Sequence, residues 1–412
     1  MIRPRQGSLF PYQETLFYRK LFLYKQFPIC ENKGMQNTSG QFETTILQAL
    51  RNQIPVRDLP GVRIRTVRQQ PQERFDVSFE VESGASRVLV FGEIKQTLSP
   101  KLLQEIAPWI RRMKALRPGV AFALISSTLT PRSQAYAIEN GIDFLDLDGN
   151  ISINVPGTFT LQRLGIRNKK SNAAPNILPA TNVFSGRSSR VLRVLLEKPK
   201  PRILTEIADE MAAETTRFQQ AFSAPQFQFA ITLGAISKAI SSLDEQLWIR
   251  RQGSSIVVPE PRRLLIEWAE KYKERYRWRL RSSFEVSNPF GSSINEISEG
   301  LKPLIRDPYA FTGAAAAGDA PFVDLDRIEA FLLAPKDDRT LRQLDQRPRL
   351  GPLLRFIYPY DSGVFMYATF DASIPRVSNI QAYLDLYAQG GRDLKQADYL
   401  LENAIEPRWK AA

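Results

Sequence analysis

The sequence predicts a multidomain protein of the mixed α/β (α+β) class. Its 412 residues are more than one hydrophobic core usually holds. Strand-like and helix-like patterns alternate in the first part of the chain, which is typical of helices packed on a sheet. The net charge is +10 over residues 1–170, +7 over 171–281 and −4 over 282–412. This division favours a polyanion as partner of the first two parts.

The composition excludes several kinds of site. Histidine is absent and Cys30 is the single cysteine, which rules out imidazole or thiolate zinc sites, disulfide frameworks and Ser-His-Asp triads. No run of about 18 uncharged apolar residues occurs, so no membrane-spanning helix and no membrane partner are expected. A lone cysteine fits a reducing compartment, and we expect a cytoplasmic protein.

The predicted elements of the first domain, residues 36–166, follow an arm of mixed aromatic and basic residues at 1–35. Met35 is an alternative start to Met1. A helix is expected at 39–50, with Ser39 as N-cap. The subsequent elements are strands at 62–67, 75–81 and 88–94, a helix at 100–116, a strand at 119–127, a helix at 131–140 and a strand at 142–153. This order predicts an α/β domain around a mixed sheet.

Two of these strands carry a pattern suited to metal chemistry. Asp76 opens one strand, and Glu93 and Lys95 share one face of the next. Antiparallel pairing would bring Asp76 beside Glu93, and two such carboxylates can bind Mg²⁺. Lysine would position water or stabilise developing charge, and Glu43 on the preceding helix would add a carboxylate. The alternative interpretation is a surface ion pair between Glu93 and Lys95.

This pattern resembles the PD-(D/E)XK nuclease superfamily, although Arg74-Phe75 stands where a proline often precedes the aspartate. The resemblance implies a restriction-endonuclease-like fold. It implies catalytic roles for Asp76, Glu93 and Lys95, for Glu43 as a helix-borne glutamate, and for Gln96 as the polar residue after the lysine. Asp76 and Glu93 would then hold Mg²⁺, provided that the site is active. This condition is needed because a fold can be reused without its chemistry.

A linker is predicted at 167–186, because this stretch is rich in Asn, Pro, Ser and Lys. Helical periodicity resumes from 187 to 281. The expected elements are helices at 188–198, 205–214 and 232–246, a hairpin turning at Gln252-Gly253, and a helix at 262–281. Residues 215–231 make an unusually long connection between the second and third helices.

The helix at 232–246 has the composition of a DNA-reading helix. Its apolar set is Leu233, Ile236, Ile240 and Leu243. Its other face offers small hydroxyls and one lysine, namely Thr232, Ser237, Lys238 and Ser241, which suit close approach to a major groove. Arg250 and Arg251 on the hairpin would reach phosphates. This block resembles winged helix-turn-helix regulators. The alternative interpretation is a winged helix that contacts another protein and not DNA.

Three ordered motifs mark the last block, predicted as a domain at 290–412. They are YAFTGAAAA at 309–317, PYDSGVF at 359–365 and VSNIQAYLDL at 377–386. With the winged helix and the DLDGN stretch, they resemble AbiEi-type antitoxins of type IV toxin–antitoxin systems over residues 40–410. No nucleophile or metal cluster is evident here, and Asp361 and Arg392 are interpreted as turn and surface residues.

The resemblance implies a protein that binds double-stranded DNA and represses its own operon. It also implies an operon partner, a nucleotidyltransferase-like toxin, which need not be contacted directly. The first functional hypothesis is therefore a DNA-binding antitoxin and transcriptional autorepressor. The alternative is an Mg²⁺-dependent DNA endonuclease of phage defence that a winged helix targets. A scaffold that binds nucleic acid without specificity is the third hypothesis.

Overall fold

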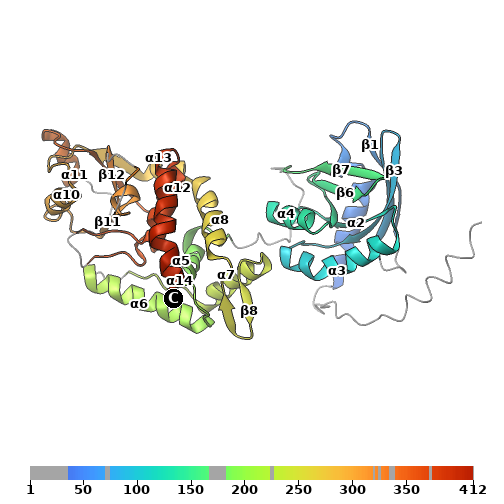
Figure 1. Cartoon of the computed structure of the whole chain (residues 1–412), viewed down its shortest axis with the longest axis horizontal. Helices are drawn as coiled ribbons and strands as arrows, with labels where there is room; N and C mark the ends of the chain where they lie inside the picture. Colours follow the sequence, from blue (N-terminus) through green and yellow to red (C-terminus); the bar gives the residue numbers. More distant parts are fainter. Residues whose placement is uncertain are drawn as a thin grey trace, which may run out of the picture.

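The computed structural model describes residues 36–69, 75–166, 182–222, 227–318, 321–322, 326–333, 339–370 and 374–411. These residues form an N-terminal lobe (36–166) and a C-terminal lobe (182–411), which lie side by side along the longest axis (Figure 1). The fold is mixed α/β, as predicted. The predicted arm at 1–35 and most of the predicted linker lie outside the described residues.

The N-terminal lobe is built on a seven-stranded mixed sheet whose strands lie in chain order. The strands are β1 (Val62–Gln69), β2 (Val77–Ser83), β3 (Ser86–Ile94), β4 (Val120–Ser126), β5 (Asp143–Asp146), β6 (Ile151–Val155) and β7 (Phe159–Arg163). β3, β4 and β5 are parallel neighbours, and the other pairs are antiparallel. The strand predicted at 142–153 is wrong. The chain turns between β5 and β6, because the Asp146 carboxylate accepts the Gly149 and Asn150 N–H groups.

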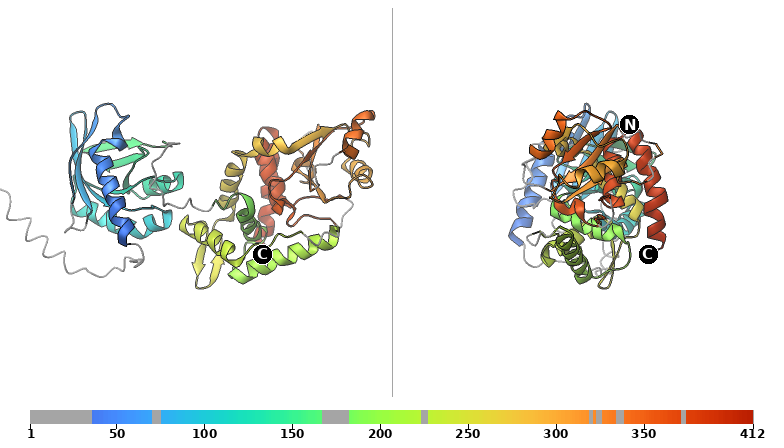
Figure 2. Two further views of the ribbon diagram at one scale, coloured as in Figure 1. Left: turned by 180° about the vertical axis from the view of Figure 1, so that it is seen from behind. Right: turned by 90° about the vertical axis from the view of Figure 1, so that its left-hand side faces the viewer.

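Helices cover both faces of this sheet. α2 (Gln36–Arg51) packs its apolar side against one face, and α3 (Pro100–Leu116) and α4 (Pro131–Glu139) pack against the other. In Figure 2, seen from behind, α2 lies in front of the sheet. Because α2 begins at Gln36, Ser39 lies inside the helix and is not its N-cap. The bounds predicted for α3 are confirmed, and Ser99 caps that helix.

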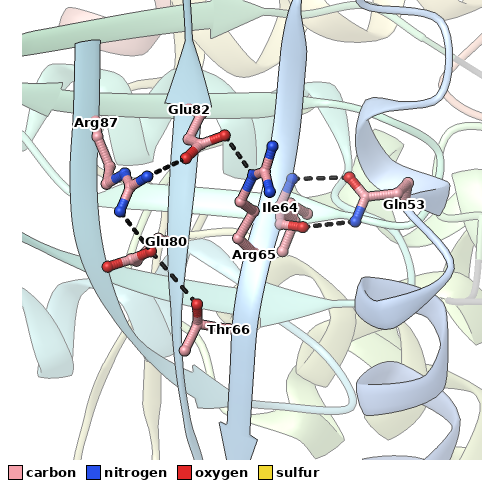
Figure 3. Close-up of polar contacts among 7 residues, drawn as sticks. All are labelled: Gln53, Ile64, Arg65, Thr66, Glu80, Glu82 and Arg87. Atoms are coloured by element: carbon pink, nitrogen blue, oxygen red, sulfur yellow. Dashed lines mark hydrogen bonds and ion pairs between the residues drawn. The ribbon is translucent and has the colours of Figure 1, made fainter.

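Polar side chains secure the first three strands (Figure 3). The Gln53 amide pairs with both backbone groups of Ile64, donating to the carbonyl at 2.6 Å and accepting from the N–H at 2.7 Å. Arg65 and Arg87 both donate to the Glu82 carboxylate at 2.5 Å. The Glu82 contacts help to fix the register of β2 against its two neighbours, β1 and β3.

Within the C-terminal lobe, residues 189–257 form three helices and a hairpin, called here the helix–hairpin unit. Its elements are α5 (Ser189–Glu197), α6 (Leu204–Phe222), α7 (Leu233–Glu245), β8 (Arg250–Gln252) and β9 (Ser255–Val257). Arg202, between α5 and α6, forms a β-bridge with Ile256. The helix predicted at 205–214 continues to Phe222, because Phe218 and Phe222 pack in an aromatic cluster with Phe370.

The rest of this lobe is a four-stranded sheet with helices around it. Its elements are α8 (Pro261–Lys273), α9 (Tyr276–Arg279), β10 (Ser283–Val286), α10 (Ile294–Leu301), β11 (Tyr309–Thr312), β12 (Arg327–Leu332), α11 (Arg339–Arg342), β13 (Leu353–Ile357), α12 (Asn379–Gln389), α13 (Arg392–Leu400), a π-helical turn (Leu401–Ile405) and α14 (Glu406–Lys410). The strand order is β10-β13-β12-β11. Because β10 joins this sheet, the sheet begins before residue 290.

One hydrophobic cluster runs from the helix–hairpin unit into the helices of the last block. It contains Leu192 of α5, Leu243 of α7 and Tyr383 of α12, and α12 packs between α8 and the sheet (Figure 1). Val183 and Phe184, placed by sequence in the linker 167–186, are buried in the same cluster. The blocks predicted at 187–281 and 290–412 therefore share a core.

Candidate functional site

The N-terminal lobe brings Asp76 against the end of β3. Val77 pairs with Gly92, and the Asp76 N–H donates to the Gly92 carbonyl at 3.1 Å. The Asp76 Oδ2 atom accepts the Ile94 N–H at 2.6 Å. One residue further along this antiparallel register, Asp76 lies opposite Glu93, and partners in such a pair point to the same face. This is the arrangement that the sequence predicted.

Glu93 and Lys95 form an ion pair, with 2.7 Å between Lys95 Nζ and Glu93 Oε1. Their side chains are 17% and 28% exposed, respectively, so solvent reaches both. By strand alternation they lie on the α3 face with Phe91, whereas Val90 and Ile94 face α2. This contact also agrees with the alternative interpretation, a surface ion pair between Glu93 and Lys95.

Glu43 does not join Asp76 and Glu93 in a group of three carboxylates. Glu43 lies on α2, whose apolar side packs on the opposite sheet face from Glu93. Within the residues that the structure describes, no group of three or more acidic or cysteine side chains is placed to hold a metal ion. Gln96 is exposed, and its backbone carbonyl accepts the Ser126 hydroxyl at 3.1 Å.

Asp76 and Glu93 are still the ligand type that Mg²⁺ uses, since it often binds one or two carboxylates and keeps its waters. One Asp76 oxygen is occupied by the Ile94 N–H, and one Glu93 oxygen faces Lys95. Each carboxylate keeps a second oxygen for a metal. Two carboxylates with one such oxygen each are a donor set of the type that Mg²⁺ uses, without a contribution from Glu43.

On α7, the predicted DNA-facing residues fall into two groups. Lys238 and Thr232 are exposed, whereas Ser237 and Ser241 are half-buried. Thr232 is also the N-cap of α7, because its Oγ1 atom accepts the Ala235 N–H at 3.2 Å. Leu233, predicted as part of the apolar core face, is 53% exposed at the start of this helix.

Leu233 is exposed because it occupies the first turn, before α7 reaches the core. Ala239 is the buried residue that the prediction omitted. An apolar side chain thus lies on the outer surface beside the Thr232 cap. A helix start of this kind can present apolar contact to a groove as well as hydrogen bonds.

Both hairpin arginines, Arg250 and Arg251, are exposed. Arg251 Nη2 lies 3.4 Å from the Ser241 hydroxyl oxygen, and Arg251 Nε lies 3.6 Å from Asp244 Oδ2. The structure therefore places the base of the hairpin against the same helix that carries Lys238. Cationic side chains from two elements lie on one part of the surface.

Asp244 also joins the two lobes, because Lys101 Nζ of α3 lies 2.7 Å from its Oδ2 atom. Nearby, Arg132 of α4 donates to the Gln246 carbonyl at 2.6 Å, and its guanidinium lies 3.3 Å from the centroid of the Trp248 ring. Burial, together with Arg263, lowers the pKa of Arg132 to about 10, so it remains charged at neutral pH. The sequence carried no signal of these contacts, since their partners are more than 100 residues apart.

The second C-terminal motif contains a buried ion pair. Arg190 of α5 donates Nε to Asp361 Oδ1 at 2.9 Å and Nη2 to Asp361 Oδ2 at 2.8 Å. Burial raises the pKa of Asp361, but the hydrogen bonds and charge of Arg190 outweigh it, so the pKa lies below 3.8. Asp361, interpreted from sequence as a turn residue, also accepts the Gly363 N–H at 2.8 Å and thus has both roles.

The first and third motifs meet at a buried carboxylate, Asp385 of α12. It accepts the Tyr272 hydroxyl at 2.5 Å, the Thr312 hydroxyl at 2.5 Å and the Gln381 amide at 2.7 Å. Burial raises the pKa of Asp385. Residues of all three motifs therefore hold the last block against α5 and α8.

No protein-family model matches the chain, and no curated protein matches it significantly. Among solved structures, the apo form of EndoMS is similar to part of it, with 13% identity over 21% of this chain and 38% of that chain. The TM-score is 0.16, which is too low to establish a shared fold. No helix in the described ranges combines the length and apolar character needed to cross a membrane.

Proposed function

We propose that the chain binds double-stranded DNA through the helix–hairpin unit, as a winged helix-turn-helix. The order of its elements supports this assignment: three helices, a hairpin, and a β-bridge from Arg202 that adds a third extended segment to the hairpin. The observation that carries the proposal is the exposed face of α7 with Lys238, against which Arg251 of the hairpin packs.

Each predicted residue has a role in this proposal. α7 enters the major groove, where Ser237, Lys238 and Ser241 contact base edges and Leu233 contacts a thymine methyl group. Thr232 caps α7 at the groove. The N-terminus of α7 also favours a phosphate, because its N–H groups and the helix dipole attract an anion. The hairpin arginines, Arg250 and Arg251, contact backbone phosphates and set the register of the helix.

The biological role that we propose is that of an antitoxin and transcriptional autorepressor of a type IV toxin–antitoxin system. The support is the resemblance of the three motifs to AbiEi-type antitoxins. Asp361 and Gln381 accept hydrogen bonds from Arg190 and Arg193 of α5, and Thr312 donates to Asp385 within the last block. The operon partner in this proposal is a nucleotidyltransferase-like toxin, without a requirement for direct contact.

The test of DNA binding uses the full chain and the duplex upstream of its own operon. We expect a retarded complex that survives an excess of unrelated duplex, because base contacts give specificity and phosphate contacts do not. Equal competition by the unrelated duplex would contradict a repressor and favour a scaffold without specificity.

A second candidate function, Mg²⁺-dependent DNA cleavage, is favoured by the contact of Asp76 with the strand end that carries Glu93 and Lys95. In this proposal the N-terminal lobe is restriction-endonuclease-like, and Asp76 and Glu93 hold the ion. A bound Mg²⁺ would polarise the phosphate and lower the pKa of water. Lys95 would stabilise charge on the phosphate, and exposed Gln96 would contact DNA.

The cleavage test follows nicking of supercoiled plasmid with Mg²⁺ or Mn²⁺. The variants are Glu93→Ala and Lys95→Ala, and the matched control is Glu105→Ala, an exposed carboxylate of the same lobe. Nicking that only the first two substitutions abolish would establish the nuclease. Intact plasmid with the wild-type chain would leave this lobe a DNA-binding role alone.

A further inference from the structure

A small cavity lies inside the C-terminal lobe, between α5, the segment α8–α9 and the ends of β12 and β13. Its volume is about 30 Å³, where one water needs roughly 10–15 Å³. Arg193 and Arg279 line it, together with the aromatic rings of Trp268 and Tyr272. Tyr360, another lining residue, is 70% exposed, so the cavity reaches the surface there.

Arg193 is buried, with 4% of its surface exposed, and it is only partly paired. Its Nη2 atom donates to the Gln381 amide oxygen at 2.5 Å. Its Nε and Nη1 atoms are buried and have no hydrogen-bond acceptor among the described residues. Burial lowers its pKa to about 10, so Arg193 is charged at neutral pH.

Arg279 approaches the cavity from α9. Its guanidinium lies 3.5 Å from the centroid of the Tyr272 ring, which fixes its position. Its Nη1 atom is buried and likewise lacks an acceptor within the described part of the chain. Two guanidinium groups with unused donors therefore line one cavity.

The carboxylates nearby do not use these donors. Asp361 lines the cavity, but one of its oxygens accepts Arg190 Nε and the Gly363 N–H, and the other accepts Arg190 Nη2. Asp385 accepts only neutral donors, from Tyr272, Thr312 and Gln381. The charges of Arg190 and Asp361 cancel. The two positive charges of Arg193 and Arg279 then exceed the one negative charge of Asp385 by one.

We propose that this cavity binds a small oxyanion, either inorganic phosphate or the phosphate group of a small molecule, between Arg193 and Arg279. A planar guanidinium pairs with the oxygens of a phosphate through charge-assisted hydrogen bonds. The oxyanion supplies the missing acceptors and the missing negative charge. The cavity volume equals that of two or three waters, so it admits the anion oxygens that face the two arginines, and the rest of the ligand extends past Tyr360.

The test measures phosphate binding to the full chain by calorimetry, at constant ionic strength with chloride as the counter-anion. The diagnostic variant is Arg279→Gln, and the matched control is Arg277→Gln, which removes the same charge from an exposed position on the same helix. We expect the Kd for phosphate to rise about tenfold or more in Arg279→Gln and to stay unchanged in Arg277→Gln.

Thermal unfolding gives a second readout, in which each protein is compared with itself in phosphate and in chloride. Phosphate should raise the Tm of the wild-type chain and of Arg277→Gln above the Tm in chloride, but not that of Arg279→Gln. Equal effects of phosphate on all three proteins, or no binding to the wild type, would overturn the proposal. Competition by ribose 5-phosphate would identify a phosphorylated small molecule as the source, and failure to compete would identify inorganic phosphate.

Discussion

At the scale of single residues, Asp361 shows how one side chain joins distant parts of the chain. It turns the backbone at Gly363 and forms a two-pronged ion pair with Arg190, 171 residues earlier. Both side chains are largely buried, with 7% of Arg190 and 15% of Asp361 exposed. Removal of one partner leaves the other charge buried and unpaired, which is costly.

The first prediction is that Asp361→Asn lowers the free energy of unfolding by about 3–5 kcal/mol. Urea denaturation at pH 7 measures the change, and the exposed Asp307 provides the control Asp307→Asn, for which about 0.5 kcal/mol or less is expected. A loss of similar size in both variants would contradict a special role for the ion pair.

The second prediction concerns pH. Because the folded pKa of Asp361 lies below 3.8, its ionised form stabilises the fold fully above this value. The contribution disappears as the pH falls from 3.8 through the lowered folded pKa. The difference in unfolding free energy between the wild type and Asp361→Asn should therefore shrink between pH 5 and pH 2. A difference that is independent of pH would contradict this assignment.

The third prediction concerns Gly92, the β3 residue that pairs with Val77. A Cβ atom there would lie 2.5 Å from Ile125 Cδ1 and 2.8 Å from Val77 Cγ1, so Gly92→Ala should cost about 1–3 kcal/mol by overpacking. The control is Gly40→Ala in α2, where a Cβ meets nothing within 4 Å. That control should be stabilising by roughly 0.5–1 kcal/mol. Urea denaturation measures the unfolding free energies. An equal change in Gly92→Ala and Gly40→Ala would refute the packing argument.

At the scale of elements, the sequence predicted what local patterns determine. The bounds of α3 follow from the Ser99 cap, Pro100 at the first turn and an apolar stripe. The antiparallel contact of Asp76 with the end of β3 followed from strand alternation. By contrast, the extension of α6 to Phe222 depends on Phe370, far along the chain, and no local pattern encodes that partner.

The same distinction explains the candidate sites. Exposure of Lys238 and of the hairpin arginines follows from helix and hairpin periodicity, so these residues could be chosen from sequence. The failure of Glu43 to join Asp76 could not be predicted, because it depends on which sheet face α2 covers. Arg132 reaches Gln246 only through the docking of two lobes.

The fourth prediction tests that docking. The double substitution Lys101→Ala with Arg132→Ala removes the ion pair to Asp244 and the stacking on Trp248, so the lobes should separate more freely. Small-angle X-ray scattering should then report a larger radius of gyration than for the wild type. Arg111→Ala, an exposed change on α3, serves as the control, and an unchanged radius in the double variant would contradict the contact.

At the scale of the whole molecule, the contacts of Lys101 and Arg132 set the N-terminal lobe beside the end of α7. Residues 1–281 carry the positive charge of the chain, and residues 282–412 are net acidic. A duplex bound at α7 would therefore lie near the positive part of the molecule. The acidic part would hold the helices of the helix–hairpin unit in place through the shared core.

The central claim is that the exposed face of α7 and the hairpin bind DNA. The most direct test is fluorescence anisotropy with the chain's own upstream duplex over a range of salt concentrations. The variants are Lys238→Ala and Arg250→Ala, with Lys302→Ala as the exposed control outside the unit. We predict weaker binding for each of the first two and no change for the control, and the slope of log K against log salt should fall by about one in Arg250→Ala, which loses a phosphate contact. Affinity and slope equal to those of the wild type in both variants would contradict the claim.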